Sequence, residues 1–301
     1  MKLHRDPVIA ACRVRPGRNV RIADFDPAAD CSPEFATLGD GPVKERARRF
    51  LEANRAELSA AQELLWASDT HSVLVILQAM DAAGKDGTIK HVMSGLNPQG
   101  CNVYGFKRPS EQELDHNFLW RYWDKVPERG RIGIFNRSYY EEVLVVKVHP
   151  EVLARQKLPP GKRGTAFWAA RYADINHFER HLVRNGTLVL KFFLNVSRAE
   201  QKRRLLARLD VADKQWKFSV ADLAERSYWA EYMDAHRDML RTTSTKWAPW
   251  YVIPADRKYV ARALVADILT RTIRSLGLAY PTISPLGRRA LAAARRQLRG
   301  E

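Results

Sequence analysis

Residues 72–90 read SVLVILQAMDAAGKDGTIK, and this stretch decides the fold. An apolar run meets a turn of small residues, then Gly84-Lys85, then a segment that can begin a helix. This order is typical of a phosphate-binding loop, in which backbone N–H groups point inward and the following helix end adds partial positive charge. A lysine here supplies a mobile cation. The loop residues expected around a phosphate are Ala82, Ala83, Gly84, Lys85, Asp86, Gly87 and Thr88.

The loop departs from the usual pattern G-x-x-x-x-G-K-[ST] at two places. Ala79 stands where the first glycine belongs, and Asp86 stands where the hydroxyl residue belongs. Asp86 itself, or Thr88, could compensate for the missing hydroxyl. On the pattern alone, a buried strand followed by an ordinary strand-to-helix turn remains an alternative.

Composition narrows the class of protein. The chain has 301 residues, 46% of them hydrophobic, which suits one large domain or two small ones. It shows no apolar window long enough for a membrane span and no signal peptide, and its three scattered cysteines fit a reducing cytoplasm. The net charge of +16 indicates a polyanionic partner, or else a basic surface that aids solubility.

Strand and helix patterns alternate along most of the chain. Short apolar segments predict strands at 72–78, 101–106, 131–136, 187–195 and 249–253. Helical spacing predicts helices at 86–95, 111–124, 138–147, 166–184, 198–209, 220–241 and 256–276. Alternation of this kind predicts an α/β fold with a five-stranded parallel sheet and helices on both faces. Such sheets bind ligands at the carboxyl ends of their strands, where the loop lies.

The chain divides into three parts. Residues 1–68 form an arm followed by an amphipathic helix at 43–67 that packs on the core. Residues 69–280 form the main domain. Residues 281–301 are basic and form either a helix or a disordered tail.

A second group of polar residues follows the third strand. Asn136, Arg137 and Ser138 stand at its exit, near the loop, and an arginine there can donate two hydrogen bonds to phosphate oxygens. Phosphoryl transfer usually needs Mg²⁺, and Asn136 lacks the charge of a metal-binding aspartate. Glu141 or Glu142 could supply that charge. Both could equally be acids that complement a helix dipole.

Asp81 lies within the loop itself. A carboxylate beside bound phosphate is repelled unless a cation intervenes, so we expect Asp81 to bind Mg²⁺. The alternative is an aspartate that stiffens the loop through hydrogen bonds to backbone N–H groups.

Further cations follow the second and fourth strands. Lys107 and Arg108 come directly after a strand, and Arg121 lies among aromatic residues. The segment at about 200–222 is predicted to be a lid, with Trp216 and Phe218 as apolar anchors, because kinases close such basic segments over the transferred phosphate. A solvated basic helix face is the alternative. The basic residues of this segment are Lys202, Arg203, Arg204, Arg208, Lys214 and Lys217, and of these we expect Arg204, Arg208, Lys214 and Lys217 at the site.

Together these stretches resemble the polyphosphate kinase 2 family. The matching segments are 78–87 (QAMDAAGKDG), 130–142 (GRIGIFNRSYYEE), 216–219 (WKFS) and 248–258 (APWYVIPADRK), and they span roughly residues 45–275. The resemblance implies a three-layer P-loop kinase fold with a lid. It implies reversible, Mg²⁺-dependent transfer of the terminal phosphate of inorganic polyphosphate to a nucleotide.

The resemblance also implies roles for individual residues. Asp81, with Glu141, should bind Mg²⁺, and Lys85 and Arg137 should stabilise charge on the transferred phosphoryl group. A lid arginine, Arg204 or Arg208, should complete the cage. Many members of the family carry aspartate where Asn136 stands; Asn136 with Glu141 resembles the subgroup, class III, that accepts both AMP and ADP.

The partners expected are therefore inorganic polyphosphate and adenine nucleotides, with guanine nucleotides left open. We expect no specific nucleic acid and no membrane as partners, and a homo-oligomer, either a dimer or a tetramer. Two other functions remain open at this point. One is an ATP-dependent nucleoside monophosphate kinase, and the other is a basic nucleic-acid-binding protein, although no standard motif of that class is present.

Overall fold

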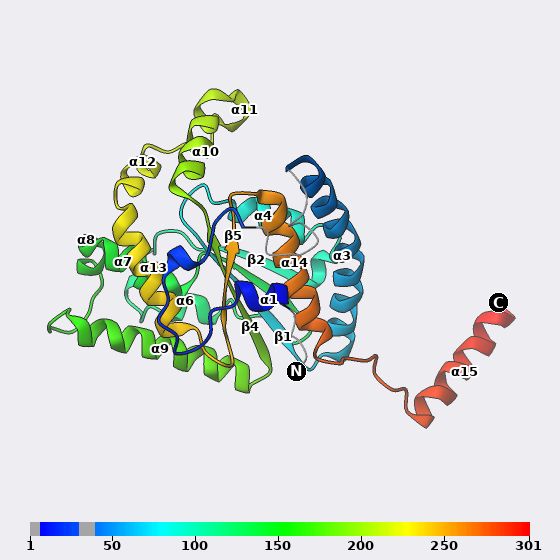
Figure 1. The fold of residues 1–301 in the computed structure, drawn as a ribbon. Coiled ribbons are helices and arrows are strands. Elements are labelled where there is room, and N and C mark those ends of the chain that lie inside the picture. Colours follow the sequence, from blue (N-terminus) through cyan, green and yellow to red (C-terminus); the bar gives the residue numbers. More distant parts are fainter. Residues whose placement is uncertain (1–6, 30–39) are drawn as a thin grey trace.

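The computed structural model describes residues 7–29 and 40–301. Its centre is a five-stranded parallel sheet in the order β2-β3-β1-β4-β5 (Figure 1). The strands are β1 (Ser72–Gln78), β2 (Cys101–Gly105), β3 (Ile132–Asn136), β4 (Thr187–Asn195) and β5 (Trp250–Pro254). The predicted α/β fold is confirmed, and each strand end lies within one residue of its predicted place.

Helices cover both faces of the sheet because alternate residues of β1 enter two different cores. Val73, Val75 and Leu77 belong to one buried cluster, whereas Leu74 and Ile76 belong to the other. The first face is covered by α3 (Asp40–Ser68), α4 (Lys85–Val92) and α14 (Lys258–Arg274), and the second face by α9 (Thr165–Arg184) and α13 (Trp229–Thr243). A strand buried on both sides reads as a continuous apolar run, as β1 does.

Three helices form a projection beyond the carboxyl ends of the strands (Figure 1). This projection, the lid, consists of α10 (Arg198–Asp210), α11 (Ala212–Gln215) and α12 (Val220–Ser227). Helices α10 and α12 begin where predicted, with the hydroxyls of Ser197 and Ser219 accepting from backbone N–H groups. Near the C-terminus, α15 (Pro285–Gly300) stands apart from the body and buries no side chain (Figure 1).

Short elements complete the chain. The arm contains α1 (Pro7–Cys12) and η2 (Ile22–Asp24), and Cys31, one of the three cysteines, lies outside the described residues. The others are η3 (Pro98–Gly100), α5 (Glu111–Leu114), α6 (Trp120–Trp123), η4 (Tyr139–Val143), α7 (Val145–Val148) and α8 (Pro150–Ala154). Among the described helices, none combines the length and the apolar character that crossing a membrane requires.

Three predicted helices are broken. The segment 111–124 forms α5 and α6, because Asn117 accepts the N–H of Leu119 with its side chain and so competes with the helix. The segment 138–147 starts as the tight helix η4 and changes to α7 at Leu144. The segment 220–241 breaks at Tyr228, where the backbone leaves the helical region with ψ of 26°. Periodicity alone misses these breaks because apolar spacing continues across them.

Candidate active site

The loop between β1 and α4 is shaped to hold an anion. Ala82 and Gly84 both have positive φ, at 60° and 109°, and Gly84 immediately precedes the first turn of α4. Backbone that alternates in this way turns N–H groups toward one concave side. The conformation is easy for glycine but costs about 1–3 kcal/mol for Ala82, which the surrounding structure must offset.

Lys85, the first residue of α4, extends its side chain back to the start of this loop. Its ammonium donates to the carbonyl oxygens of Ala79, at 2.9 Å, and of Met80, at 3.4 Å. Burial, reinforced by the nearby Arg137 guanidinium, lowers the pKa of Lys85 from its ordinary value. An anion bound in the loop would favour the charged ammonium and relieve both effects.

Arg137 joins the exit of β3 to the loop. Its backbone has a φ of 64°, and its N–H donates to the carbonyl of Leu77 at 3.2 Å, next to the end of β1. Its guanidinium lies 2.9 Å from Oδ1 of Asp81 and 3.6 Å from Oε2 of Glu141. Burial raises the pKa of Glu141, and Arg137 opposes that rise. The structure thus brings together Asp81, Lys85, Arg137 and Glu141.

Asn136, Ser138 and Thr88 lie beside this group in different ways. Nδ2 of Asn136 donates to Oδ1 of Asp86 at 2.7 Å and so ties β3 to the start of α4. Ser138 is fully buried, and its hydroxyl accepts from the backbone of Tyr140 at the start of η4. Thr88 is buried within α4. Ser138 and Thr88 therefore support the site from inside the protein.

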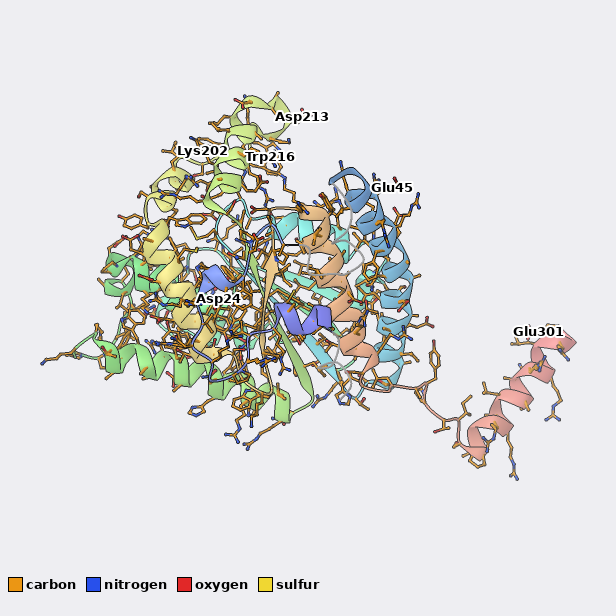
Figure 2. The ribbon with its side chains drawn as sticks, viewed as in Figure 1. Asp24, Glu45, Lys202, Asp213, Trp216 and Glu301 are labelled. Carbon is orange, nitrogen blue, oxygen red and sulfur yellow. The ribbon has the colours of Figure 1, made fainter. Side chains whose placement is uncertain are left out.

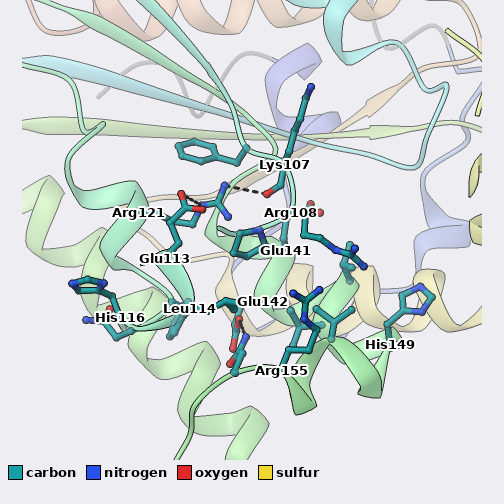
Figure 3. Close-up of a pocket in the computed structure, with 18 of the residues that line it drawn as sticks. Lys107, Arg108, Glu113, Leu114, His116, Arg121, Glu141, Glu142, His149 and Arg155 are labelled. Carbon is teal, nitrogen blue, oxygen red and sulfur yellow. Dashed lines mark hydrogen bonds and ion pairs between the residues drawn. The ribbon is translucent and has the colours of Figure 1, made fainter. Parts of the chain in front are cut away.

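A large pocket adjoins Arg137 and Glu141 on the second face of the sheet. It has a volume of about 560 Å³ and lies between the segment 106–121 and helices α7 and α8 (Figure 3). Lys107, Arg108, Arg121, Arg137 and Glu141 all line it. Arg121 is mostly buried, donates to the carbonyl of Lys107 and pairs with Glu113, so it orients the segment that carries Lys107 and Arg108 (Figure 3).

A basic groove lies on the first face of the sheet. It has a volume of about 630 Å³ and is formed by α3, the end of α4, α10 and the start of α14. Its cations include Lys44, Arg48, Arg55, Arg203, Lys258 and Arg262. Burial, together with the positive charge of Arg204, lowers the pKa of Lys258 to about 8. The groove therefore concentrates positive charge that an anion would stabilise.

Sequence reasoning missed the groove. Its residues come from segments more than 200 residues apart in the chain, from Lys44 to Arg262. The available signal was Arg257-Lys258, which comes within four residues of the end of β5, much as Lys107-Arg108 comes within three residues of the end of β2.

A smaller cavity of about 260 Å³ lies under the lid. It is lined by Asp81, Arg137 and Glu141 from the body and by Asp222 and Glu225 from α12. Within the described residues, no three His, Cys, Asp or Glu side chains are arranged as a complete metal site. Mg²⁺ is commonly held by only one or two carboxylates together with substrate phosphates, and Asp81 and Glu141 fit that kind of site.

The predicted lid cations have different surroundings. Arg208 donates to Asp222 within the lid, at 2.7 Å. Lys214 and Lys217 are exposed, and Lys217 lies over the ring of Trp216, which is 78% exposed at the tip of the projection (Figure 2). Arg204, in contrast, is 6% exposed and bound to backbone carbonyls of the loop.

Comparisons with known proteins agree on one family. The family model described as Polyphosphate kinase 2 matches residues 42–277. An ADP-polyphosphate phosphotransferase of Rhodopseudomonas palustris is 52% identical over 256 residues, covering 85% of this chain and 89% of the relative. An AMP/ADP-polyphosphate phosphotransferase of Meiothermus ruber is 44% identical over 269 residues, covering 89% and 94%.

The same family appears among solved structures. The crystal structure of Polyphosphate Kinase 2 from Arthrobacter aurescens TC1 superposes with a TM-score of 0.82 and 39% sequence identity. The match covers 93% of this chain and 95% of that one.

Proposed function

Because the chain belongs to the polyphosphate kinase 2 family, we propose that it transfers the terminal phosphoryl group of inorganic polyphosphate to AMP or ADP. The observation that carries this proposal is the meeting of Asp81, Lys85 and Arg137 at the loop, between the large pocket and the basic groove. Two cations at one anion-binding loop suit the charge that develops during phosphoryl transfer.

The large pocket suits the acceptor nucleotide. Its volume of about 560 Å³ is in the range of small-molecule sites, and its wall combines apolar side chains with cations. Lys107, Arg108 and Arg137 would attract the acceptor's phosphates, while the apolar wall would receive the nucleoside. Adenine nucleotides as acceptors follow from the names of the relatives.

The basic groove suits the donor. Polyphosphate is a linear polyanion, and a row of lysines and arginines binds such a chain largely by releasing its counterions. The groove supplies this row from α3, α10 and α14, on the opposite face of the sheet from the pocket. Donor and acceptor would then meet end to end at the loop, with Lys85 between them.

The chemistry asks for little beyond charge and position. An oxygen of the nucleotide phosphate attacks the terminal phosphorus of the polymer, and the bond from that phosphorus to the bridging oxygen breaks. The nucleotide gains one phosphoryl group, and the polymer loses one unit. The attacking oxygen is already anionic, so no general base is required; alignment and stabilisation by Lys85 and Arg137 account for the rate.

We propose Mg²⁺ as the cofactor. Asp81 and Glu141 would hold it, because both offer carboxylate oxygens and both line the same small cavity beside the loop. When bound, the ion would offset negative charge on the phosphates.

The test supplies polyphosphate and Mg²⁺ with AMP, ADP, GMP or GDP as separate acceptors, without ATP, and measures nucleotide products by chromatography. We expect ADP and ATP to form, with Lys85→Ala as the inactive control. Absence of any product in the wild-type reaction would overturn the proposal. Phosphorylation of AMP by ATP, without polyphosphate, would indicate a nucleoside monophosphate kinase instead.

A further inference from the structure

Three successive carbonyls of the phosphate-binding loop are held by one helix. Nε2 of Gln201, on α10, donates to the carbonyl oxygen of Asp81 at 3.0 Å. Nη1 of Arg204, one turn further along, donates to the carbonyls of Ala82 at 3.2 Å and of Ala83 at 2.6 Å. The base of the lid is therefore bonded directly to the loop.

Both side chains are buried and fully engaged. Gln201 is 1% exposed and Arg204 is 6% exposed. Nη2 of Arg204 reaches the carbonyls that follow β5, those of Ala255 at 2.5 Å and Asp256 at 3.0 Å, while its Nε donates to Glu200 at 2.7 Å. Each nitrogen of this guanidinium has a protein partner, so Arg204 bridges two loops instead of facing the phosphates.

These bonds decide where the N–H groups of the loop point. In a planar peptide unit, the C=O of one residue and the N–H of the next point in opposite directions. Holding the carbonyls of Asp81 and Ala83 toward α10 turns the N–H groups of Ala82 and Gly84 away from it. The positive φ angles of those same two residues are what this arrangement requires.

A third residue links α12 of the lid to this contact. Nη1 of Arg226, on α12, donates to Oε1 of Gln201 at 2.6 Å and to the backbone carbonyl of Arg198 at 2.9 Å. A path of hydrogen bonds thus runs from α12 through Gln201 to the backbone of Asp81, the expected metal ligand.

We propose that Gln201 and Arg204 are positioning residues, which hold the loop in its anion-binding conformation. In the same proposal, Arg226 couples the position of α12 to the loop conformation through its hydrogen bond to Gln201. The proposal rests on the proposed function and changes one role within it, because Arg204 acts on the loop backbone and not on the transferred phosphoryl group. In this proposal, movement of the lid is confined to the residues that follow Arg204 in the chain, while the first two turns of α10 stay with the body.

The first test is Gln201→Leu, which keeps the size of the side chain and removes both hydrogen bonds. Misplacing a reacting group by about 1 Å costs about 100-fold in rate, so we expect kcat with polyphosphate to fall about 10- to 100-fold. The KM for the nucleotide should change less than about threefold, since the large pocket contains neither Gln201 nor Asp81. Ala199→Leu, at an exposed and uncharged position on the same helix, is the matched control and should leave kcat unchanged.

The second test compares Arg204→Lys with Arg204→Ala. A lysine keeps the charge but cannot bond four carbonyls in a fixed fork. A positioning role predicts that both variants lose kcat to a similar extent. Recovery of most of the rate by Arg204→Lys would mean that the charge itself stabilises the phosphoryl group, and would overturn the proposal.

Amide hydrogen exchange of residues 79–88 supplies a measurement that does not depend on the reaction. We expect faster exchange in Gln201→Leu than in Ala199→Leu, with the exchange of β4 unchanged. Wild-type exchange in this segment together with wild-type kcat would refute the inference. A wild-type protein that fails to transfer phosphate would refute the proposed function instead, and the exchange result would still decide the inference.

Two further variants separate a loss of kcat that comes from a misplaced loop from one that comes from lower folding stability. Leu58→Ala removes a fully buried side chain of α3 and should lower the melting temperature without affecting kcat in the folded protein. Arg226→Gln changes a partly exposed residue and should fold even if the buried variants do not. It should raise the exchange of the loop and lower kcat about three- to tenfold, less than the full loss of a charged hydrogen bond implies, because Arg226 acts on the loop only through Gln201. Unchanged exchange and kcat in Arg226→Gln would remove the link to α12.

Discussion

Replacing Asn136 by aspartate tests the contact between β3 and the loop. In the wild type, Nδ2 of Asn136 donates to Oδ1 of Asp86 across 2.7 Å. Asn136→Asp removes the donor and places a second carboxylate beside the first. The variant therefore adds one negative charge close to where the phosphates of donor and acceptor would meet.

The local cost follows from two effects. A hydrogen bond to a charged group contributes about 1.5–3 kcal/mol. Two unit charges 4 Å apart repel by about 1 kcal/mol in water and about 4 kcal/mol at an effective dielectric constant of 20. Because Asp86 is exposed, it can rotate into water, so we expect the lower end of these values, about 2–3 kcal/mol.

This extra charge should act unequally on the two acceptors. ADP carries one more negative charge than AMP, so the added carboxylate should penalise ADP more. If the added charge raises the barrier for ADP by about 1.4 kcal/mol more than the barrier for AMP, the ratio of the two rates changes tenfold. We therefore expect kcat/KM to fall for both nucleotides and the AMP-to-ADP ratio of kcat/KM to rise about tenfold, measured at saturating polyphosphate.

A swap of the two side chains provides the control. The double variant Asn136→Asp with Asp86→Asn restores both the total charge and the possibility of a hydrogen bond between the two positions. If repulsion between them causes the effect, the double variant should recover most of the lost kcat/KM, as a coupled pair does in a double-mutant cycle. An AMP-to-ADP ratio within twofold of the wild type in Asn136→Asp would refute the reasoning.

Three other predictions concern single residues. Lys85→Ala should lower kcat at least about 100-fold with little change in melting temperature, because its ammonium bonds only carbonyls of its own loop; a rate within tenfold of wild type contradicts its role. The KM for polyphosphate should rise as the pH passes through about 8, because Lys258 then loses its proton, and Lys258→Arg, which stays charged, should flatten that rise; equal pH profiles would exclude Lys258. Lys191→Met should lower the free energy of unfolding by about 3–5 kcal/mol, because the fully buried Glu179 loses the cation that balances its charge, and adding Glu179→Leu should restore much of the loss in a thermal melt.

Much of the fold was predictable because buried parallel strands leave a simple pattern. β1 and β4 are continuous apolar runs, and Gly84-Lys85 marks where the chain turns into a helix. Once the sheet is parallel, the ends of β1 and β3 must meet at one edge. That geometry alone brings Asp81 and Arg137 near each other, and the structure places them 2.9 Å apart.

The remainder depends on side-chain direction and on long-range packing. Arg204 and Arg208 are one turn apart on the same helix, yet one is buried against the loop and the other pairs within the lid. A sequence pattern shows that both are basic but not which way each points. The basic groove is likewise invisible until α3 packs against α14, because each segment alone looks like a solvated helix face.

The pocket and the groove open on opposite faces of the sheet, and this separation affects how a long polymer is consumed. If the nucleotide binds in the pocket and the polymer in the groove, as proposed, a finished nucleotide can leave through its own entrance while the polymer keeps its contacts on the other side. The same polymer can then advance by one unit and meet a fresh acceptor. We therefore expect individual chains to be shortened over many successive turnovers, so that early in the reaction intact chains coexist with very short ones.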